Sequence, residues 1–174
     1  MSFTDFKNLI ASTASRYGYS AALMAAQVAA ESRFNPGAVS PTGAQGLSQF
    51  EPSTWSEWGH GGDPFDPAAN LDANARYMSW LLGQFSGAAS QTELALAAYN
   101  WGIGHVKNLV ARTGRSDWAY LAPMTPAETQ GYVTRIMDNL SSYKAAFGIA
   151  LGSAGLLIVG VAVLLGWTLL RRIV

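Results

Sequence analysis

The longest uncharged stretch of the chain divides it into two unequal parts. Residues 145–170 read AAFGIALGSAGLLIVGVAVLLGWTLL, without a single charged side chain. As a helix this stretch would be about 39 Å long, enough to cross a hydrocarbon core about 30 Å thick. Lys144 on one side and Arg171 with Arg172 on the other bracket it, as charges bracket membrane spans. We therefore expect a domain at 1–143 and a single transmembrane anchor at 144–174.

Two further points concern this predicted anchor. A buried core helix is the alternative, but such a helix rarely stays uncharged for 26 residues. Gly148 and Gly152 have the GxxxG spacing that is found where membrane helices pair, so the anchor could bind a second copy of the chain or another membrane protein. The first 20 residues are polar or charged at every turn and have no apolar core, so we expect no secretory signal peptide there.

The domain before the anchor has the apolar spacing of helices and no convincing alternation of a strand, which predicts an all-α fold. Ser20 and Asp66 are expected N-caps, Asp66 being followed by proline at the first helical position. Residues 32–66 hold most of the proline and glycine and are expected to form a loop with short helical turns. The expected helices cover 2–17, 20–31, 67–84, 92–100, 102–114 and 126–143, the last of which could run on into the anchor.

Composition excludes several classes of function. The chain has no cysteine, and its two histidines, His60 and His105, lie far apart, so we expect neither a metal site nor a disulfide framework. Residues 1–140 carry eight positive and eleven negative charges. A net charge of −3 over this region does not suit nucleic-acid binding. Nothing in the sequence indicates a cofactor.

A single carboxylate, Glu31, ends an otherwise apolar helical segment. Met24, Val28 and Glu31 follow one another at i, i+4 and i+7, so they share one face of the helix. Burial on that face and the negative end of the helix dipole would both raise the pKa of Glu31. A glutamic acid that stays protonated near neutral pH is suited to general acid catalysis. The alternative is a solvated glutamate at a helix end.

The sequence around Glu31 resembles a known motif. ESRFNPGAVSPTGAQGLSQFEPST, residues 31–54, looks like the catalytic motif of the SLT-type lytic transglycosylases, a lysozyme-like family. Three further blocks follow in the family's order: DPFDPAANLDANARYM, ALAAYNWGIGHV and PAETQGYVTRI. Together the four blocks cover about residues 20–137. The resemblance implies a lysozyme-like helical domain that cleaves peptidoglycan.

The resemblance also implies roles for individual residues. Glu31 would be the only acid and base, protonating the β-1,4 bond between N-acetylmuramic acid and N-acetylglucosamine and then deprotonating the muramic 6-hydroxyl to leave a 1,6-anhydro end. Substrate contacts are implied for residues in the later blocks and in the loop: Ser40, Gln49, Tyr99, Asn100, Glu128 and Tyr132. Asn100 could instead cap a helix, and Tyr132 could be ordinary core. Trp55, Trp58, Trp101 and Trp118 could stack on sugars or belong to the core.

Glu51 departs from the family's pattern, which has an apolar residue two positions after the motif's glutamine. It could be a loop carboxylate beside the substrate or a second catalytic carboxylate. The second case would make the chain a lysozyme-type hydrolase of the same bond. A third interpretation is a non-catalytic module that binds peptidoglycan and anchors it to a membrane. For an anchored enzyme we expect a single-pass protein of a phage's inner virion membrane, or of a bacterial inner membrane facing the periplasm. In the first case the anchor could also bind virion membrane proteins.

Overall fold

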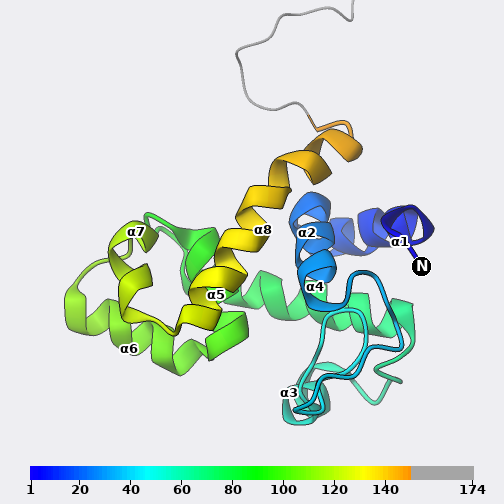
Figure 1. The fold of residues 1–174 in the computed structure, drawn as a ribbon, viewed down its shortest axis with the longest axis horizontal. Helices are drawn as coiled ribbons and strands as arrows, with labels where there is room; N and C mark the ends of the chain where they lie inside the picture. Colours follow the sequence, from blue (N-terminus) through cyan, green and yellow to red (C-terminus); the bar gives the residue numbers. More distant parts are fainter. Residues whose placement is uncertain (150–174) are drawn as a thin grey trace, which may run out of the picture.

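The computed structural model describes residues 1–149 of the 174-residue chain. Helices dominate this part of the chain and no named strand occurs in it, as the sequence predicts (Figure 1). The elements are α1 (Phe3–Arg16), α2 (Ala21–Ser32), α3 (Pro52–Trp58), α4 (Pro67–Gln84), α5 (Gln91–Trp101), α6 (Ile103–Thr113), α7 (Trp118–Leu121), the 3₁₀ turn η1 (Ala122–Met124) and α8 (Ala127–Ala146).

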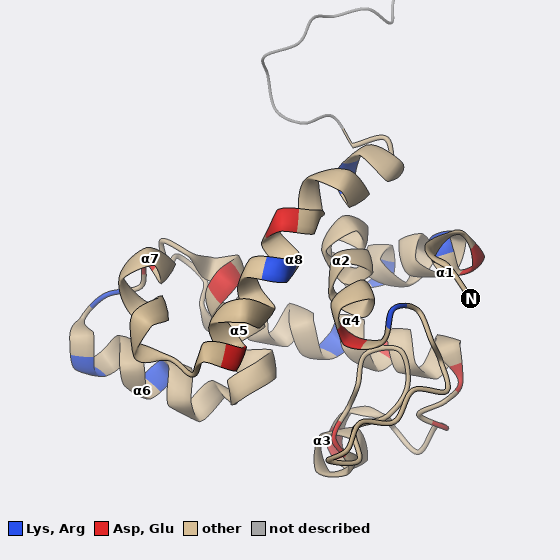
Figure 2. Cartoon of the chain, viewed as in Figure 1, with Lys and Arg blue, Asp and Glu red and all other residues tan. Residues whose placement is uncertain are grey.

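Helix α2 lies at the centre of the packing. It contacts α8 along one side and α1 along another, while α5 packs against α4, α6 and α8. Seven consecutive residues of α2, from Ala22 to Val28, are buried. Six of the seven are apolar, and their removal from water contributes most of what holds this helix in place. Figure 2 shows that α2 carries no charge until its carboxyl-terminal end, which is where Glu31 lies.

The helix starts follow the predicted capping residues. Ser20 Oγ accepts a hydrogen bond of 3.3 Å from the Leu23 amide, and Asp66 Oδ1 accepts one of 2.8 Å from the Ala69 amide. These bonds satisfy amides that have no partner inside the helix. Helix α5 is different, because Ser90 occupies the N-cap position but its hydroxyl instead accepts from the Trp118 amide at 2.9 Å.

A long loop between α2 and α3 carries much of the predicted motif. Two isolated bridges, Val39 with Gln45 and Gln45 with Phe50, fold it back on itself. Gly46 allows this fold, since it has a φ of +76° and a Cβ there would collide with the Pro64 carbonyl oxygen. Asn70 of α4 fixes the same loop by accepting from the Ser48 amide at 2.9 Å.

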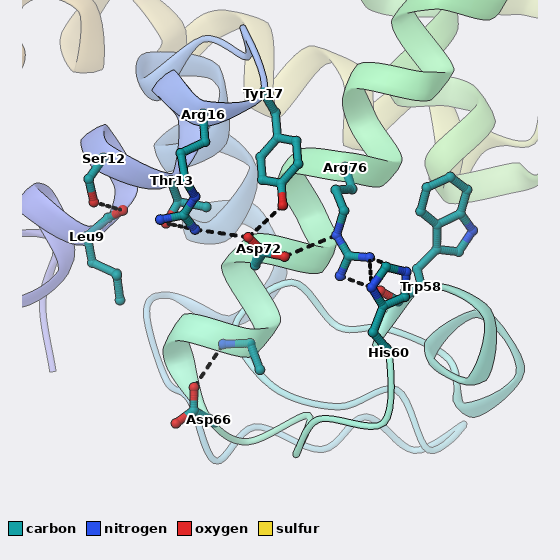
Figure 3. A network of polar contacts seen from close by, with 11 residues as sticks. Leu9, Ser12, Thr13, Arg16, Tyr17, Trp58, His60, Asp66, Asp72 and Arg76 are labelled. Carbon is teal, nitrogen blue, oxygen red and sulfur yellow. Dashed lines mark hydrogen bonds and ion pairs between the residues drawn. The ribbon is translucent and has the colours of Figure 1, made fainter.

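A polar network joins α1 and α4 to the segment that follows α3 (Figure 3). Asp72 of α4 accepts from Arg16 at 2.9 Å, from the Tyr17 hydroxyl at 2.8 Å and from Arg76 at 3.0 Å. Arg76 also donates to the Trp58 carbonyl oxygen at 2.8 Å and contacts His60. Arg76 therefore holds the end of α3 against α4.

The carboxyl-terminal part differs from the expectation in two ways. The short elements α7 and η1 do not appear among the expected helices. Helix α8 ends at Ala146 instead of continuing, with Gly148 at a φ of +69°. Such a glycine commonly follows a helix end.

The predicted anchor falls mostly outside this description. Within residues 1–149, no helix is both long and apolar enough to span a bilayer. The predicted span at 145–170 lies outside the described residues from position 150 onward.

Candidate active site

Glu31 lies in the last turn of α2, with its side chain partly buried. Its Oε1 accepts a hydrogen bond of 2.7 Å from the hydroxyl of Tyr132, which α8 supplies from 101 residues further along the chain. Tyr132 itself is 3% exposed and packs in the core. The two predicted site residues are thus in direct contact, and the contact holds the carboxyl group in one orientation.

The surroundings of Glu31 keep it protonated near neutral pH. Burial raises the pKa of Glu31 from 4.5 to about 8. The Tyr132 hydrogen bond and the charge of Arg135 act in the opposite direction and lower this pKa, whereas the charge of Glu128 raises it. Burial prevails because an ionised carboxylate loses its hydration when it is enclosed by protein. Glu31 can therefore donate a proton at pH 7, as a general acid must.

Tyr99 comes from α5 and reaches the same region from another side. Its hydroxyl donates a hydrogen bond of 2.7 Å to the Ser48 carbonyl oxygen in the loop. Burial, followed by the charge of Glu31, raises the pKa of Tyr99 well above its usual range. Tyr99 thus binds the loop instead of orienting Glu31 directly, while Tyr132 makes the direct contact.

Ser40 and Gln49, both predicted to contact substrate, make hydrogen bonds within the loop. Ser40 Oγ accepts from the Ala44 amide at 3.0 Å and lies 2.9 Å from the Thr42 hydroxyl. Gln49 Nε2 donates to the carbonyl oxygens of Ala38 and Gly46 at 3.1 and 2.9 Å. Both side chains keep the loop in shape, and both remain partly accessible to a ligand.

Glu51 is exposed and forms the N-cap position of α3. One of its carboxylate oxygens accepts from the Thr42 hydroxyl at 2.9 Å. A small hollow of about 50 Å³ opens beside it, lined by Gln49, Phe50, Glu51, Thr54, Tyr77 and Tyr99. Three predicted site residues, Gln49, Glu51 and Tyr99, therefore border one concavity, and Glu31 is not among the residues that line it.

The other predicted residues lie around α5 and α8. Asn100 Oδ1 accepts from the Thr129 hydroxyl at 2.8 Å, which ties α5 to α8. Glu128 is exposed in the first turn of α8.

The four tryptophans that the sequence offers as possible sugar platforms are partly buried. Trp55 packs edge-on against Phe50 with centroids 5.6 Å apart, and Trp101 stacks on His105 at 4.8 Å. Trp58 lies against Tyr77 and the more exposed Trp80, and Trp118 packs against the core.

Sequence reasoning missed the polar side chains beneath Glu31. Gln27, Asn74 and Tyr19 are buried, and Gln27 is hydrogen-bonded to Tyr19, to Asn74 and to Tyr132. A glutamine four residues before Glu31 in an otherwise apolar helix is the signal that could have found them, because a buried amide needs partners. Within residues 1–149, no group of three or more His, Cys, Asp or Glu side chains is arranged to hold a metal ion.

Comparison with known proteins agrees with this geometry. Membrane-bound lytic murein transglycosylase C of Yersinia enterocolitica is 37% identical over 163 residues, covering 78% of this chain and 46% of the relative. Membrane-bound lytic murein transglycosylase F of Desulfosudis oleivorans is 39% identical over 106 residues, covering 59% and 23%. This chain therefore spans less than half the length of either relative.

The fold of the described residues is also similar to that of a solved lytic transglycosylase structure. The X-ray structure of an inactive mutant of the lytic transglycosylase Slt from Pseudomonas aeruginosa matches with a TM-score of 0.73 and 25% identity, covering 83% of this chain and 24% of that one. The family described as Transglycosylase SLT domain matches residues 8–121, which include Glu31, Gln49 and Tyr99 but not Tyr132. The match covers well over half of the sequence, and the chain therefore belongs to the SLT transglycosylase domain family.

Proposed function

We propose that this chain is a peptidoglycan lytic transglycosylase with Glu31 as its only acid and base. The observation that carries the proposal is the partly buried Glu31 carboxyl, held by Tyr132 and protonated at neutral pH, within an SLT domain. The names of the relatives, lytic murein transglycosylases, support murein as the substrate.

The proposed reaction uses the Glu31 carboxyl group twice, first as an acid and then as a base. Protonated Glu31 gives its proton to the glycosidic oxygen between N-acetylmuramic acid and N-acetylglucosamine, and the bond to the muramic C1 breaks. The Glu31 carboxylate then takes the proton of the muramic 6-hydroxyl as that oxygen bonds to C1. The 1,6-anhydro ring forms without water, and Glu31 is protonated again. Because the substrate supplies the nucleophile, a second carboxylate is not required.

Substrate would enter along the hollow beside the α2–α3 loop. The rings of Tyr77 and Tyr99 offer apolar faces of the kind that pack on sugar rings, and Gln49 and Glu51 offer polar atoms at the rim. Glu51 is exposed and bound to Thr42, which supports a role beside the substrate over a second catalytic carboxylate.

To test this proposal, the full chain in detergent is added to a suspension of purified peptidoglycan sacculi, and the turbidity of the suspension is followed. A transglycosylase lowers the turbidity of the suspension and releases soluble muropeptides. A non-catalytic peptidoglycan-binding module would sediment with the sacculi and release nothing. The second result would refute the proposal and leave only the binding function.

We further propose that residues 145–170 anchor the domain in a membrane. The uncharged run and its flanking charges support this, as do relatives named membrane-bound. Carbonate extraction of membranes tests it: an anchored chain stays in the pellet, and release into the supernatant refutes the anchor.

The membrane that we propose is that of a phage virion, because a domain carried there meets the cell wall from outside without export. A bacterial inner membrane is the alternative, and the bacterial membrane-bound relatives favour it. Protease digestion of intact virions and of spheroplasts distinguishes the two, since only the membrane that carries the chain will yield the fragment containing Glu31.

A further inference from the structure

Gln27 lies one helical turn before Glu31 and is fully buried in α2. Its Oε1 accepts two hydrogen bonds of 3.1 Å, one from the Tyr19 hydroxyl and one from Nδ2 of Asn74. Its Nε2 donates a third, also 3.1 Å long, to the hydroxyl oxygen of Tyr132. The same Tyr132 hydroxyl donates to Glu31 at 2.7 Å. A continuous path of hydrogen bonds therefore runs from the core to the carboxyl group.

The donors around Gln27 fix the direction of this path. In the orientation that the structure gives to the Asn74 amide, Nδ2 faces Gln27 and can only donate, so the group of Gln27 that faces it is the carbonyl oxygen. The amide nitrogen is then directed at Tyr132. A tyrosine hydroxyl has one proton, and because its oxygen already receives a hydrogen bond from Gln27, that proton is directed to Glu31.

We propose that Gln27 is a positioning residue that orients the Tyr132 hydroxyl proton toward Glu31 through the buried contacts with Tyr19 and Asn74. Donation from Gln27 also polarises the hydroxyl and strengthens its bond to the carboxyl group, because linked hydrogen bonds reinforce one another in a protein interior. The inference rests on the proposed role of Glu31, but the geometry that carries it does not depend on activity.

Other groups also act on Glu31 and must be kept constant in a test. Tyr132, Arg135 and Glu128 face it from α8, and the charge of Glu31 is felt by Tyr99 from α5. Of these four groups, Tyr132 is the one to which Gln27 donates a hydrogen bond in the described structure. A change in the titration of Glu31 on substitution of Gln27 therefore reports on the path through Tyr132.

The first measurement needs no Gln27 variant. In the full chain in detergent, NMR follows the side-chain amide of Gln27 and the carboxyl carbon of Glu31 across pH 5–10. We expect the Gln27 amide to titrate with the midpoint of Glu31, and to stop doing so in Tyr132→Phe. The amide of Gln130, which donates to the Thr125 carbonyl oxygen at 2.9 Å, is the internal control. A Gln27 amide that does not titrate, or that still titrates in Tyr132→Phe, overturns the proposal.

The second measurement is a double-mutant cycle. Gln27→Met weakens the bond from Tyr132 to the carboxylate, so the titration midpoint of Glu31 should rise, by less than it rises in Tyr132→Phe. The double variant should match Tyr132→Phe, since Gln27 acts through Tyr132. Additive shifts, or a Gln27→Met midpoint equal to wild type, contradict the proposal. Gln130→Met should leave the midpoint unchanged.

These measurements distinguish the proposed role of Gln27 from the proposed catalytic role of Glu31. The titration of Glu31 is measured without substrate. The proposed role of Gln27 can therefore be refuted in a chain that clears sacculi, and it can be supported in a chain that does not clear them. Gln27→Met leaves two donors, Tyr19 and Asn74, without an acceptor. If this variant does not fold, adding Tyr19→Phe removes one of these donors. The titration of the Gln27 amide in the wild type then still tests the proposal.

Discussion

The Tyr132 hydroxyl of α8 donates a hydrogen bond of 2.7 Å to Glu31 at the end of α2. This contact joins two helices that pack along one another, and it fixes the one carboxyl group to which the chemistry is assigned. The carboxyl is oriented by a neutral donor and not by a cation, so it can stay protonated while it is held. Orientation and a raised pKa are thereby combined at one residue.

Replacing Glu31 by glutamine should abolish cleavage of sacculi. The amide keeps the shape of the carboxylic acid and can still accept from Tyr132, but it cannot give or take the proton. General acid and base catalysis typically contributes about 10²–10⁴-fold, so the rate of turbidity loss should fall at least this far. Glu93→Gln, in the first turn of α5, is the matched control and should keep its activity. A folded Glu31→Gln variant that clears sacculi at the wild-type rate would remove Glu31 from the mechanism.

Relative to the wild type, Glu31→Gln should become more stable toward unfolding as the pH rises. Glu31 has its pKa raised from 4.5 to about 8, so the folded state binds a proton that the unfolded state has lost between these values. The free energy of unfolding of the wild type should therefore fall from pH 4.5 to 8, by at most about 1.4 kcal/mol per pH unit.

Urea unfolding of the full chain in detergent measures this effect. Glu31→Gln has no such proton, so its advantage over wild type should grow between pH 5 and 8. Glu93→Gln, measured alongside, gives the effect of replacing a carboxyl by an amide elsewhere in the domain. A constant difference between Glu31→Gln and wild type across this range would mean that Glu31 is not buried as a neutral acid.

Glu51→Gln should slow turnover by only a few-fold and leave the product unchanged. Thr42 can still donate to the amide oxygen at this position, so the loop keeps its shape. Measuring the rate of muropeptide release together with the chemistry of the new ends tests both statements. A loss as large as that of Glu31→Gln, or reducing ends in place of anhydro ends, would show that Glu51 is a second catalytic carboxylate.

Arg76→Met should lower the free energy of unfolding by about 1–3 kcal/mol, because it removes one of the three donors to the partly buried Asp72 and the side-chain donor to the Trp58 carbonyl oxygen. Arg16→Met is the control: it removes another partner of Asp72, but the Arg16 side chain is 55% exposed, so less than about 1 kcal/mol should be lost. Urea denaturation of both variants gives the comparison. Equal losses would mean that the contact of Arg76 with the end of α3 adds nothing.

The helices are predictable where local sequence sets them. Ser20 and Asp66 cap α2 and α4 at the expected positions, since a cap needs only a side-chain oxygen beside a free amide. The four-residue α7 escapes prediction because one turn leaves no periodicity to detect. Helix α8 ends at Ala146, three residues beyond the predicted end at 143.

For the candidate site, the sequence predicts the raised pKa of Glu31 but not the contacts around that residue. The position of Glu31 at the end of an apolar face is enough to predict a raised pKa. Sequence does not distinguish which tyrosine binds it, because Tyr99 and Tyr132 approach from different helices and only packing directs one of them to the Ser48 carbonyl. Gln27 escapes prediction for the same reason, as its partners are supplied by α4, α8 and the turn before α2.

Mass spectrometry of the muropeptides released from purified sacculi by the full chain tests the central claim most directly. With Glu31 as the only acid and base, every new glycan end should be a 1,6-anhydromuramic residue, and digestion in ¹⁸O-labelled water should add no label. Reducing ends that carry ¹⁸O would contradict the account and identify the chain as a lysozyme-type hydrolase.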